Sequence, residues 1–406
     1  MNKDIEKTVT EIRGKFDTSK LSDFITNENA ISSNPSVSLG IHIPKWQGPL
    51  TIKQFVFGQS NPTYLIIDAN NNLSVLRRKP FPNSKLVSKS AHAIEREFFI
   101  INGINTLNER SSKKVPVPDT YFLCEDESII GYVFYVMEYV EGASIKNPDM
   151  GDLAPAKKDQ LWNSIMDTIT AIHSLDADKL IESLPEKHFP QFKKPKSVTG
   201  SSASYFERQM KTLAGVSKKQ GETVEPIPHF DVITQYILKN APKDPVKKML
   251  IHGDCKIDNF LFDKQLNKVI AVLDWELCTF GHPLFDLANF LQPFQIPNEL
   301  NALFFAPLET DVGKENSASL QLIQDKLKLY KQKLGFVWDP NDPSNDPVKK
   351  WQVGFLFGLV RLSVISQGIA MRIKKGSASS ANAAGFGSLY PYLAELVFGD
   401  IRPPKL

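Results

Sequence analysis

Three polar residues between positions 250 and 276 have the types and the spacing that phosphoryl transfer requires. Asp254 is followed five residues later by Asn259, and Asp274 comes fifteen residues after Asn259. One carboxylate can orient a substrate hydroxyl group and accept its proton, while an amide oxygen and a second carboxylate can hold Mg²⁺ on the phosphates of a nucleotide. The sequence therefore predicts Asp254 and Asn259 as catalytic residues, and Asn259 and Asp274 as ligands of magnesium.

A short β-hairpin is expected to return Asp274 to the side of Asn259. The apolar runs Phe260–Phe262 and 269–273 have strand composition and enclose a polar turn at residues 263–267. Protein kinases carry the same order, H-R-D-x-x-x-x-N followed by D-F-G. His-Gly-Asp is a common tripeptide, and an Asp after a strand can simply cap a turn. The prediction therefore depends on the spacing, the hairpin and the second carboxylate occurring together.

The composition is that of an ordinary globular protein. The chain has 406 residues, of which 42% are hydrophobic and 23% are charged, and its formal net charge is +3. This weak charge gives no case for nucleic-acid binding, and no apolar run reaches about 18 residues, so no membrane span is expected. The three cysteines have no C-x-x-C spacing, which argues against a structural zinc site and for a chain without disulfides.

The two ends of the sequence bear on its location. The first seventeen residues carry several acidic side chains and no continuous apolar segment, which argues against a secretory signal. The last three residues, Pro404-Lys405-Leu406, resemble the peroxisomal address S-K-L. The sequence therefore predicts a peroxisomal protein that binds an import receptor, with a cytoplasmic location as the alternative.

Residues 50–78 are predicted to form three consecutive strands. The turn between the first two, at residues 58–61, lies where a nucleotide-phosphate loop is expected, and Ser60 and Asn61 are the candidates for phosphate contact. A single glycine is a weak signal, and an ordinary hairpin turn is the alternative. Upstream, residues 1–30 are expected to be helical because their apolar residues recur at three- and four-residue steps.

The third of these strands supplies the candidate cation for the nucleotide phosphates. Val75 and Arg77 fall on one face by the period of two, and Arg77 is the candidate, with Lys79 on the same face as the alternative. Glu97, on a helix predicted over 90–104, is expected to hold that cation in place. Basic residues at a strand end are also typical of a solvent-exposed surface, so the phosphate role depends on the neighbouring motifs.

Two further strands, at 120–124 and 131–139, complete the predicted sheet. Met137 and Tyr139, at the end of the second strand, have the composition of the hinge whose backbone binds the adenine of ATP. A strand that simply leaves a sheet has similar residues, so this signal is weak by itself.

The pattern becomes helical after these strands. The predicted fold is α+β, a two-lobed protein-kinase-like fold. Residues 1–140 are expected to form an N-lobe with an antiparallel β-sheet and the nucleotide site, and residues 141–406 a mainly helical C-lobe with the catalytic loop and the substrate site.

Several segments together resemble one known family. HGDCKIDNFLF, LDWELCTFGHPLFDLA, GPLTIKQFVFGQSNPTY, SYFERQMKT and RLSVISQGIAMR are similar to sequences of the aminoglycoside phosphotransferase-like (choline-kinase-like) small-molecule kinases. Within that family they resemble the kinase domain of the acyl-CoA dehydrogenase family member ten and eleven proteins, from about residue 15 to about residue 395. The resemblance implies ATP- and Mg²⁺-dependent phosphorylation of the hydroxyl group of 4-hydroxyacyl-CoA in hydroxy fatty acid breakdown.

The resemblance also assigns supporting and substrate residues. Asp286 is expected to support the catalytic loop, and the wider family often has an acidic residue where His282 stands. The CoA ester is expected near the SYFERQ segment, which contains Tyr205, Arg208 and Gln209, and near Arg361. Because a buried cation is rare unless it is paired, Arg361 is either tied to a core carboxylate or directed at an anionic group of the substrate.

Two other functions stay open. One is a kinase for another hydroxyl compound, such as an aminoglycoside, choline or a sugar; the basic residues of the helix at 351–375 favour an anion such as CoA instead. The other is a catalytically inactive nucleotide-binding scaffold. The complete catalytic set argues against a scaffold, while Arg77 in the place of the usual Lys leaves it open.

Overall fold

The computed structural model describes residues 6, 8–13, 16–56, 61–80, 93–193, 203–304, 308, 317–335, 342, 345–376 and 383–401. Ser60, assigned above to the nucleotide site, and residues 404–406, assigned to peroxisomal import, lie outside these residues. Both assignments therefore stay predictions.

The contacts of the chain divide it into two compact units. Unit 1 consists of Met1–Ser144, Asp176–Pro195 and Asn259–Cys278, and unit 2 of Ile145–Leu175, Lys196–Asp258 and Thr279–Leu406. The sequence analysis places its boundary after residue 140, and the chain first leaves unit 1 after Ser144 and then returns to it twice. The second return begins at Asn259, within the predicted catalytic loop.

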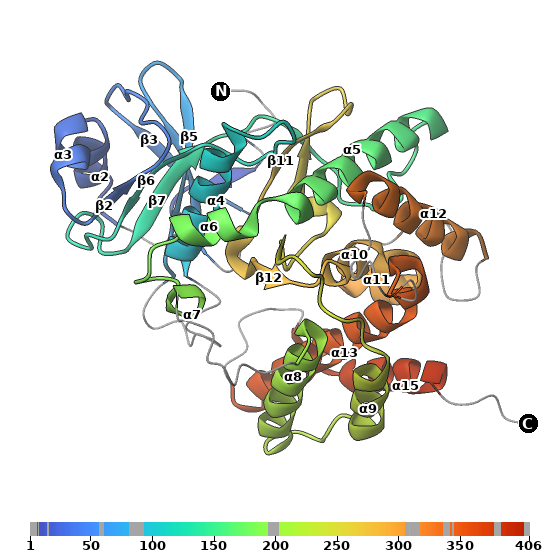
Figure 1. Cartoon of the computed structure of the whole chain (residues 1–406). Coiled ribbons are helices and arrows are strands. Elements are labelled where there is room, and N and C mark those ends of the chain that lie inside the picture. The colour runs from blue at the N-terminus through green and yellow to red at the C-terminus, as the bar shows by residue number, and fades with distance from the viewer. Residues whose placement is uncertain are drawn as a thin grey trace, which may run out of the picture. The chain divides into compact units, whose positions relative to one another are not determined.

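Unit 1 is built around an antiparallel sheet with the described strand order β1-β3-β4-β5-β7-β6-β2 (Figure 1). Its strands are β1 (Val9–Thr10), β2 (Val37–Leu39), β3 (Thr51–Phe55), β4 (Thr63–Ile67), β5 (Leu73–Arg78), β6 (Thr120–Cys124) and β7 (Phe134–Glu138). The strands predicted in residues 50–78 and 120–139 are thereby confirmed. The central strand β5 carries Arg77 opposite Thr63 and Tyr135 of its two neighbours.

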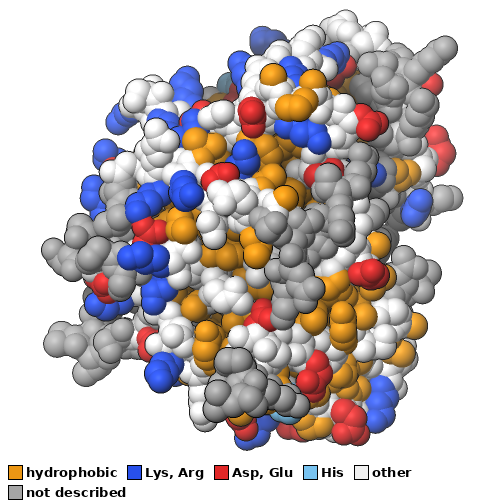
Figure 2. All heavy atoms as spheres, turned by 90° about the vertical axis from the view of Figure 1, so that its right-hand side faces the viewer, with side chains coloured by type: hydrophobic (Ala, Val, Ile, Leu, Met, Phe, Trp, Pro, Cys, Tyr) orange, Lys and Arg blue, Asp and Glu red, His pale blue; other side chains and the backbone are white. Residues whose placement is uncertain are grey.

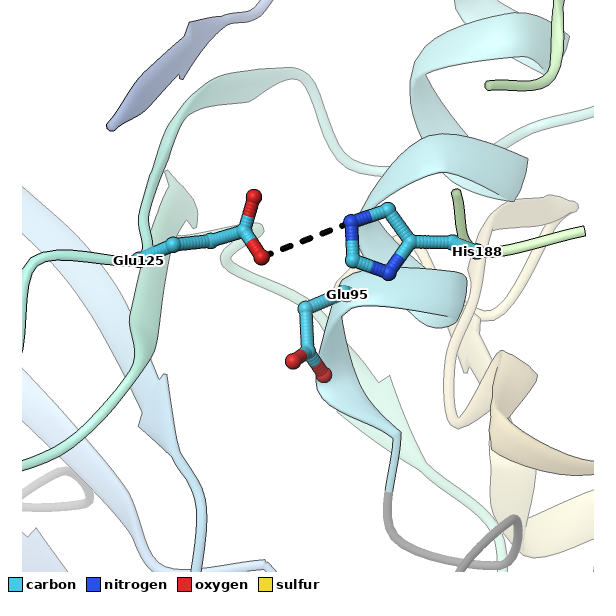
Figure 3. Close-up of side chains that lie close together, drawn as sticks. All are labelled: Glu95, Glu125 and His188. Atoms are coloured by element: carbon cyan, nitrogen blue, oxygen red, sulfur yellow. Dashed lines mark ion pairs between the residues drawn. The ribbon is translucent and has the colours of Figure 1, made fainter. Parts of the chain in front are cut away.

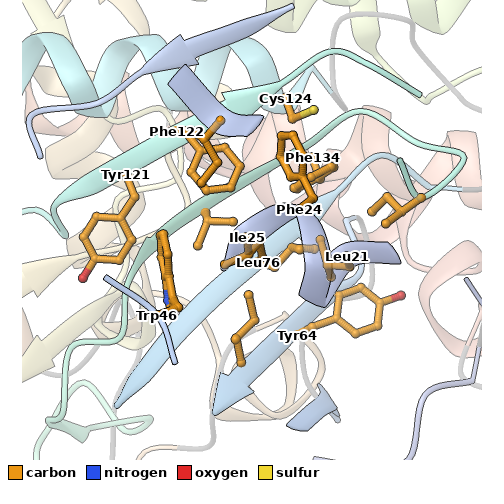
Figure 4. Packing of buried hydrophobic residues seen from close by; sticks show 14 of the residues in the cluster. Leu21, Phe24, Ile25, Trp46, Tyr64, Leu76, Tyr121, Phe122, Cys124 and Phe134 are labelled. Atoms are coloured by element: carbon orange, nitrogen blue, oxygen red, sulfur yellow. The ribbon is translucent and has the colours of Figure 1, made fainter. Parts of the chain in front are cut away.

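One face of this sheet is covered by the helix α2 (Thr18–Ile25). Asp17 begins this helix by accepting hydrogen bonds from backbone N–H groups of the first turn. Phe24 packs against Phe122 and Phe134 of the sheet, with ring centroids 6.0 and 6.4 Å apart (Figure 4). These residues belong to a buried apolar cluster, so this face carries a packed core.

The opposite face of the sheet is covered by α4 (Ile94–Asn108). Phe98 of this helix packs against Tyr135, with ring centroids 6.0 Å apart, and both belong to a buried cluster with Val75. Because side chains alternate between the faces of a strand, Arg77 projects from the same face as Val75. The sequence of β5 therefore directs Arg77 toward α4.

The N-terminal helix prediction is wrong over residues 8–13. Residues 18–33 are helical, as α2 and α3 (Glu28–Ser33), but Val9–Thr10 form β1. Val9 is buried with Leu65 and pairs with Phe55 of β3 at the edge of the sheet. The apolar side chain of Val9 fits a helical spacing and an edge strand equally well. The strand forms because β3 has an unpaired edge with which Val9 and Thr10 can pair.

A second sheet of unit 1 holds the hairpin predicted from the sequence. β10 (Phe260–Phe262) pairs with β11 (Val269–Val272) and with β8 (Ala143–Ser144), both antiparallel. The backbone N–H of Leu273 donates to the carbonyl oxygen of Asn259 at 2.8 Å. The hairpin therefore returns the chain to Asn259 immediately before Asp274, as expected.

Unit 2 is mainly helical. Its helices are α5 (Pro155–Ser174), α8 (Tyr205–Gly221), α9 (Phe230–Asn240), α10 (Leu284–Leu291), α11 (Asn298–Phe304), α12 (Ser317–Leu334), α13 (Pro347–Lys374), α14 (Ala383–Gly387) and α15 (Tyr390–Ile401). A short antiparallel pair, β9 (Met249–Ile251) with β12 (Thr279–Gly281), leads the chain into and out of the catalytic segment.

The helix α13 is the core helix of unit 2 and contacts α8, α10, α12, α14 and α15. It is long and apolar enough to cross a membrane, and 67% of its most apolar window is buried inside the structure, as is typical of a core helix. At Gly354 a Cβ atom would lie 2.7 Å from Cγ of Leu284, so α13 can approach α10 closely only because this residue is glycine.

The described surface is mixed in character. On the face drawn in Figure 2, Lys and Arg side chains are interspersed with Asp and Glu side chains and with hydrophobic groups. This agrees with the small net charge of the chain.

Candidate active site

The predicted catalytic loop begins in unit 2 directly after β9. The carboxylate of Asp286, which is fully buried, accepts the backbone N–H of His252 at 2.7 Å and that of Gly253 at 2.9 Å. Gly253 has φ +82°, a left-handed conformation that glycine adopts without steric cost. Asp286 therefore supports the loop, as the resemblance implies, and glycine fits where protein kinases have Arg.

Asp286 is itself held by a buried histidine. His173 of α5 lies with Nε2 3.2 Å from Asp286 Oδ2 and Nδ1 2.9 Å from the hydroxyl of Tyr330. Each oxygen of the Asp286 carboxylate thus has hydrogen-bond partners, as a buried carboxylate requires. His173 is therefore a buried structural histidine of the core of unit 2.

Asp254 follows Gly253 and is partly exposed. Its Oδ2 lies 3.4 Å from Nζ of Lys256, and the same ammonium group lies 3.5 Å from Asp258. Burial lowers the pKa of Lys256, but the carboxylates of Asp254 and Asp258 more than compensate and raise it. Lys256 therefore remains charged beside the carboxylate that is predicted to accept the proton of the substrate hydroxyl.

Asn259 and Asp274 lie at the two ends of the hairpin in unit 1. Asn259 is buried with 8% of its surface exposed, and 38% of the Asp274 side chain is exposed. Asp274 has φ +66° and ψ +60°, a left-handed conformation that is uncommon for a residue other than glycine. Such backbone strain persists only where the surroundings hold it and is concentrated at functional sites.

Arg77 lies beside both Glu97 and Asp274. Its Nη1 is 2.5 Å from Oε1 of Glu97, and its Nη2 is 3.3 Å from Oδ1 of Asp274. The backbone N–H of Trp275 donates to the same Glu97 oxygen at 3.2 Å. The ion pair expected from the sequence is present, and it is joined to the residue that follows the predicted magnesium ligand.

The charges of this group are strongly coupled. Burial would lower the pKa of Arg77, but the carboxylates of Glu97 and Asp274 raise it, so the guanidinium stays charged. Burial raises the pKa of Glu97, and the Arg77 guanidinium opposes that rise. The side chains of Arg77 and Glu97 are 10% and 1% exposed, so water screens their attraction only weakly.

Asn61 and Glu276 form a contact that the sequence analysis does not foresee. Asn61 is fully buried and donates from Nδ2 to Oε2 of Glu276 at 2.9 Å. Glu276 also acts electrostatically on Arg77. The signal that could have found Glu276 is its position two residues after Asp274, which places a further carboxylate next to the predicted ligand.

Lys79, the alternative phosphate cation, is engaged elsewhere. It forms an ion pair with Glu95 of α4. Glu95 lies in a cluster with Glu125 and His188, shown in Figure 3, in which the potential ligand atoms lie within 4.8 Å of one another. Lys79 and Lys187 pair with the two carboxylates of this cluster, so its charge is balanced without a metal ion.

The predicted hinge residues lie at the end of β7. Met137 is 7% exposed and packs in the cluster beneath α4, with Tyr139 against it. The backbone N–H of Glu138 donates to the carbonyl oxygen of Asp119 at 2.8 Å. The side chains thus serve the core, and adenine recognition by the backbone of this segment stays a prediction.

The predicted substrate residues have different environments. Tyr205 is buried, and burial together with the Asp286 carboxylate raises its pKa. Arg208 pairs with Asp244 at 3.4 Å and donates to a backbone carbonyl of the preceding turn. Gln209 is half-buried on the same helix, α8. Their contacts with a substrate stay predictions.

Arg361 does not follow the first of the two alternatives drawn from the sequence, a tie to a core carboxylate, and the second, contact with an anionic group of the substrate, stays a prediction. Among the described residues, no carboxylate forms an ion pair with it. Its guanidinium instead lies over the ring of Phe285, 5.0 Å from the centroid, and its nitrogens lie 3.3 Å from Oδ1 of Asn289 and 3.5 Å from the carbonyl oxygen of Gly253.

His282 lies two residues before α10 begins at Leu284 and binds the first backbone N–H group of the helix. Its Nδ1 accepts the backbone N–H of Leu284, the first residue of α10, at 3.1 Å. Burial, with a smaller effect of His173, lowers the pKa of His282 to about 3, so the ring is neutral and available as an acceptor. A neutral imidazole can therefore accept a hydrogen bond at the start of this helix.

Unit 1 has a sheet that carries the Arg77–Glu97 pair, and unit 2 is helical with a loop held by Asp286. These features define a protein-kinase-like α+β fold, and comparison with a solved structure agrees. A putative aminoglycoside phosphotransferase from Ralstonia eutropha superposes with a TM-score of 0.67, at 27% identity, over 95% of this chain and 98% of that one. The two-lobed fold predicted from the sequence is thereby confirmed.

The chain belongs to the phosphotransferase enzyme family, whose model (APH) matches residues 51–320. It is 32% identical over 351 residues to acyl-CoA dehydrogenase family member 10 of Mus musculus and 31% identical over 354 residues to family member 11 of Rattus norvegicus. These matches cover 86% and 85% of this chain, but only 29% and 40% of the two relatives. The recognition of this family from the sequence is confirmed.

Proposed function

We propose that this chain transfers the γ-phosphoryl group of ATP to the hydroxyl group of a 4-hydroxyacyl-CoA, with Mg²⁺ as cofactor. Membership of the phosphotransferase family supports the reaction class. The observation that carries the proposal is the group formed by Arg77, Glu97 and Asp274: a fixed guanidinium lies 3.3 Å from a half-exposed carboxylate. This is the combination that binding of a magnesium nucleotide requires.

The charges around Arg77 favour a divalent cation. Three carboxylates, those of Glu97, Asp274 and Glu276, act on this single guanidinium, so negative charge is in excess. Asn259 and Asp274 offer the amide and carboxylate oxygens that magnesium prefers. These two residues would hold the ion, and bound Mg²⁺ would neutralise charge on the phosphates during transfer.

Each remaining residue has a distinct task in the proposed reaction. Arg77, fixed by Glu97, binds phosphate oxygens through its planar fork. Asp254 orients the acceptor hydroxyl and takes its proton, and the Lys256 ammonium group forms an ion pair with Asp254 at 3.4 Å. Asp286 fixes the loop backbone that presents Asp254. Positioning and charge neutralisation thus supply most of the catalysis.

The acceptor is the least constrained part of the proposal. The curated relatives carry the name acyl-CoA dehydrogenase, and this chain spans less than half of their length, so their names alone do not assign a substrate. The basic end of α13, with Arg372, Lys374 and Lys375, supports an anionic acceptor, because the phosphates of CoA need cations. An aminoglycoside is polycationic and would be repelled there.

The proposal is tested by ADP release from Mg-ATP with purified protein and a panel of acceptors. The panel contains 4-hydroxyacyl-CoA, the free hydroxy acid, choline and an aminoglycoside, and Asp254→Asn serves as the inactive control. Turnover with the CoA ester alone supports the proposal. Turnover with another acceptor keeps the kinase and overturns the substrate class. ATP binding without turnover on any acceptor favours the scaffold alternative.

A further inference from the structure

Arg361 contacts the catalytic loop in a way that its place in an apolar core helix does not require. It lies on α13 and is half-buried. Its Nη2 reaches the carbonyl oxygen of Gly253 at 3.5 Å, its Nη1 reaches Asn289 Oδ1 at 3.3 Å, and its guanidinium covers the ring of Phe285. One side chain thus joins a loop carbonyl to two residues of α10.

The contact adds to the hydrogen bonding of the loop backbone. The N–H groups of His252 and Gly253 donate to the Asp286 carboxylate. The N–H of Asp254 donates to Nδ1 of His252 at 3.3 Å. The carbonyl of Gly253 is the acceptor in the peptide that links Gly253 to Asp254, and Arg361 Nη2 donates to it at 3.5 Å. The peptide immediately before the predicted base is therefore held by Arg361.

The helix α10 makes this arrangement rigid. Phe285 and Asn289 are four residues apart, so they lie on one face of the helix, while Asp286 points into the core. The Asp286 carboxylate holds the loop by accepting the backbone N–H groups of His252 and Gly253. The face with Phe285 and Asn289 holds the Arg361 guanidinium, which donates to the carbonyl oxygen of Gly253. The close contact of α10 with α13 at Gly354 fixes the distance between these two supports.

We propose that Arg361 is a positioning residue that fixes the peptide before Asp254, and that it is not a residue that binds the anionic part of the substrate. The kinetic test of this inference rests on the proposed kinase function, and the contact itself does not. An arginine is needed because a planar fork can donate in two directions while stacking on a ring, whereas a lysine ammonium is a single compact point charge. The loop can then present the Asp254 carboxylate in one orientation.

The expected kinetic signature is a loss of kcat without a loss of binding. A small misplacement of a reacting group costs on the order of tenfold to a hundredfold in rate. Arg361→Ala should therefore lower kcat by about tenfold or more and leave both KM values, for ATP and for the CoA ester, within about twofold. Arg361→Lys should also stay low in kcat, because the charge without the fork does not restore the geometry.

Chemical rescue gives the most specific test. Guanidinium ion at low millimolar concentration should restore part of kcat in Arg361→Ala, while methylammonium should not, because only the former reproduces the fork. Lys349→Ala is the matched control, since it removes an exposed cation from the same helix and should leave kcat unchanged. A large rise in the KM for the CoA ester at unchanged kcat would overturn the inference and make Arg361 a substrate-binding residue.

A second measurement does not depend on turnover. Hydrogen exchange of the backbone amides of His252 and Gly253 should be at least about tenfold faster in Arg361→Ala than in the wild type, because their peptide segment loses one of its supports. Exchange in Lys349→Ala should be unchanged. If the wild type phosphorylates no acceptor, the proposed function fails, and this measurement still decides the inference: unchanged exchange in Arg361→Ala overturns it.

Discussion

Arg77 and Glu97 form a buried ion pair whose Nη1 and Oε1 atoms are 2.5 Å apart, and the same Oε1 accepts the backbone N–H of Trp275 at 3.2 Å. A strand, a helix and the turn that follows Asp274 therefore meet at one carboxylate oxygen. The position of the cation and the position of the predicted magnesium ligand are fixed by the same side chain. Changes at Glu97 should affect both stability and nucleotide binding.

Glu97→Ala is expected to destabilise the protein by about 3 kcal/mol, because it leaves the Arg77 guanidinium buried without its partner. Glu95→Ala is the matched control: its partner Lys79 is 38% exposed and can turn to water, so the loss should be about 1 kcal/mol. Urea unfolding of both variants measures the difference. Equal losses would mean that the buried pair contributes no more than the partly exposed one.

Arg77→Met is expected to raise the KM for ATP by about tenfold, the equivalent of one charge-assisted hydrogen bond to phosphate. Lys79→Met should change the KM for ATP by less than about twofold, because Lys79 is already paired with Glu95. Initial rates at varied ATP concentration measure both values. The opposite order would assign the phosphate contact to Lys79.

Asp254→Asn is expected to lower kcat by about a thousandfold, within the range of losses seen for a positioned proton acceptor. The amide retains the shape of the side chain but cannot take the proton. Asp258→Asn removes a carboxylate that contacts the same Lys256 ammonium and should cost less than about threefold. Similar losses in both variants would point to a general effect of charge around Lys256 and not to a base at Asp254.

His282 should make the stability of the protein depend on pH. Burial and His173 lower its pKa to about 3 in the folded state, against about 6.5 in the unfolded chain. Between these values the unfolded state binds one more proton, so the free energy of unfolding falls as the pH drops below about 6.5, by up to about 1.4 kcal/mol per pH unit.

The variant His282→Asn is expected to remove this contribution. Unfolding measured between about pH 5 and pH 7 should show a shallower slope than in the wild type. An unchanged slope in His282→Asn would show that His282 is protonated in the folded state.

The sequence was most informative where local periodicity and spacing act together. The period of two in β5 placed Arg77 on the face that meets α4, and the apolar runs around residues 263–267 predicted the hairpin that returns to Asn259. In both cases the residues concerned are close in sequence or lie on neighbouring elements, so a local pattern is enough to place them. The pairing of Arg77 with Glu97 was predicted from the order of strand and helix in protein kinases, where a helix glutamate holds the cation of the strand.

The sequence was least informative where a contact depends on tertiary packing. Val9 has a helical spacing but forms an edge strand because β3 offers an open edge. Arg361 was expected either to meet a carboxylate or to face the substrate, and its partners are a ring, an amide and a backbone carbonyl. Backbone carbonyls carry no sequence signal, so such a partner could not be predicted.

The measurement that tests the central claim most directly is transfer of a labelled γ-phosphoryl group from ATP to a 4-hydroxyacyl-CoA, with the product identified by mass spectrometry. The account predicts label on the acyl hydroxyl group, dependence on Mg²⁺, and loss of transfer in Asp254→Asn but not in Asp258→Asn. Label that appears only as free phosphate, or that reaches the CoA ester equally well in Asp254→Asn, would contradict it.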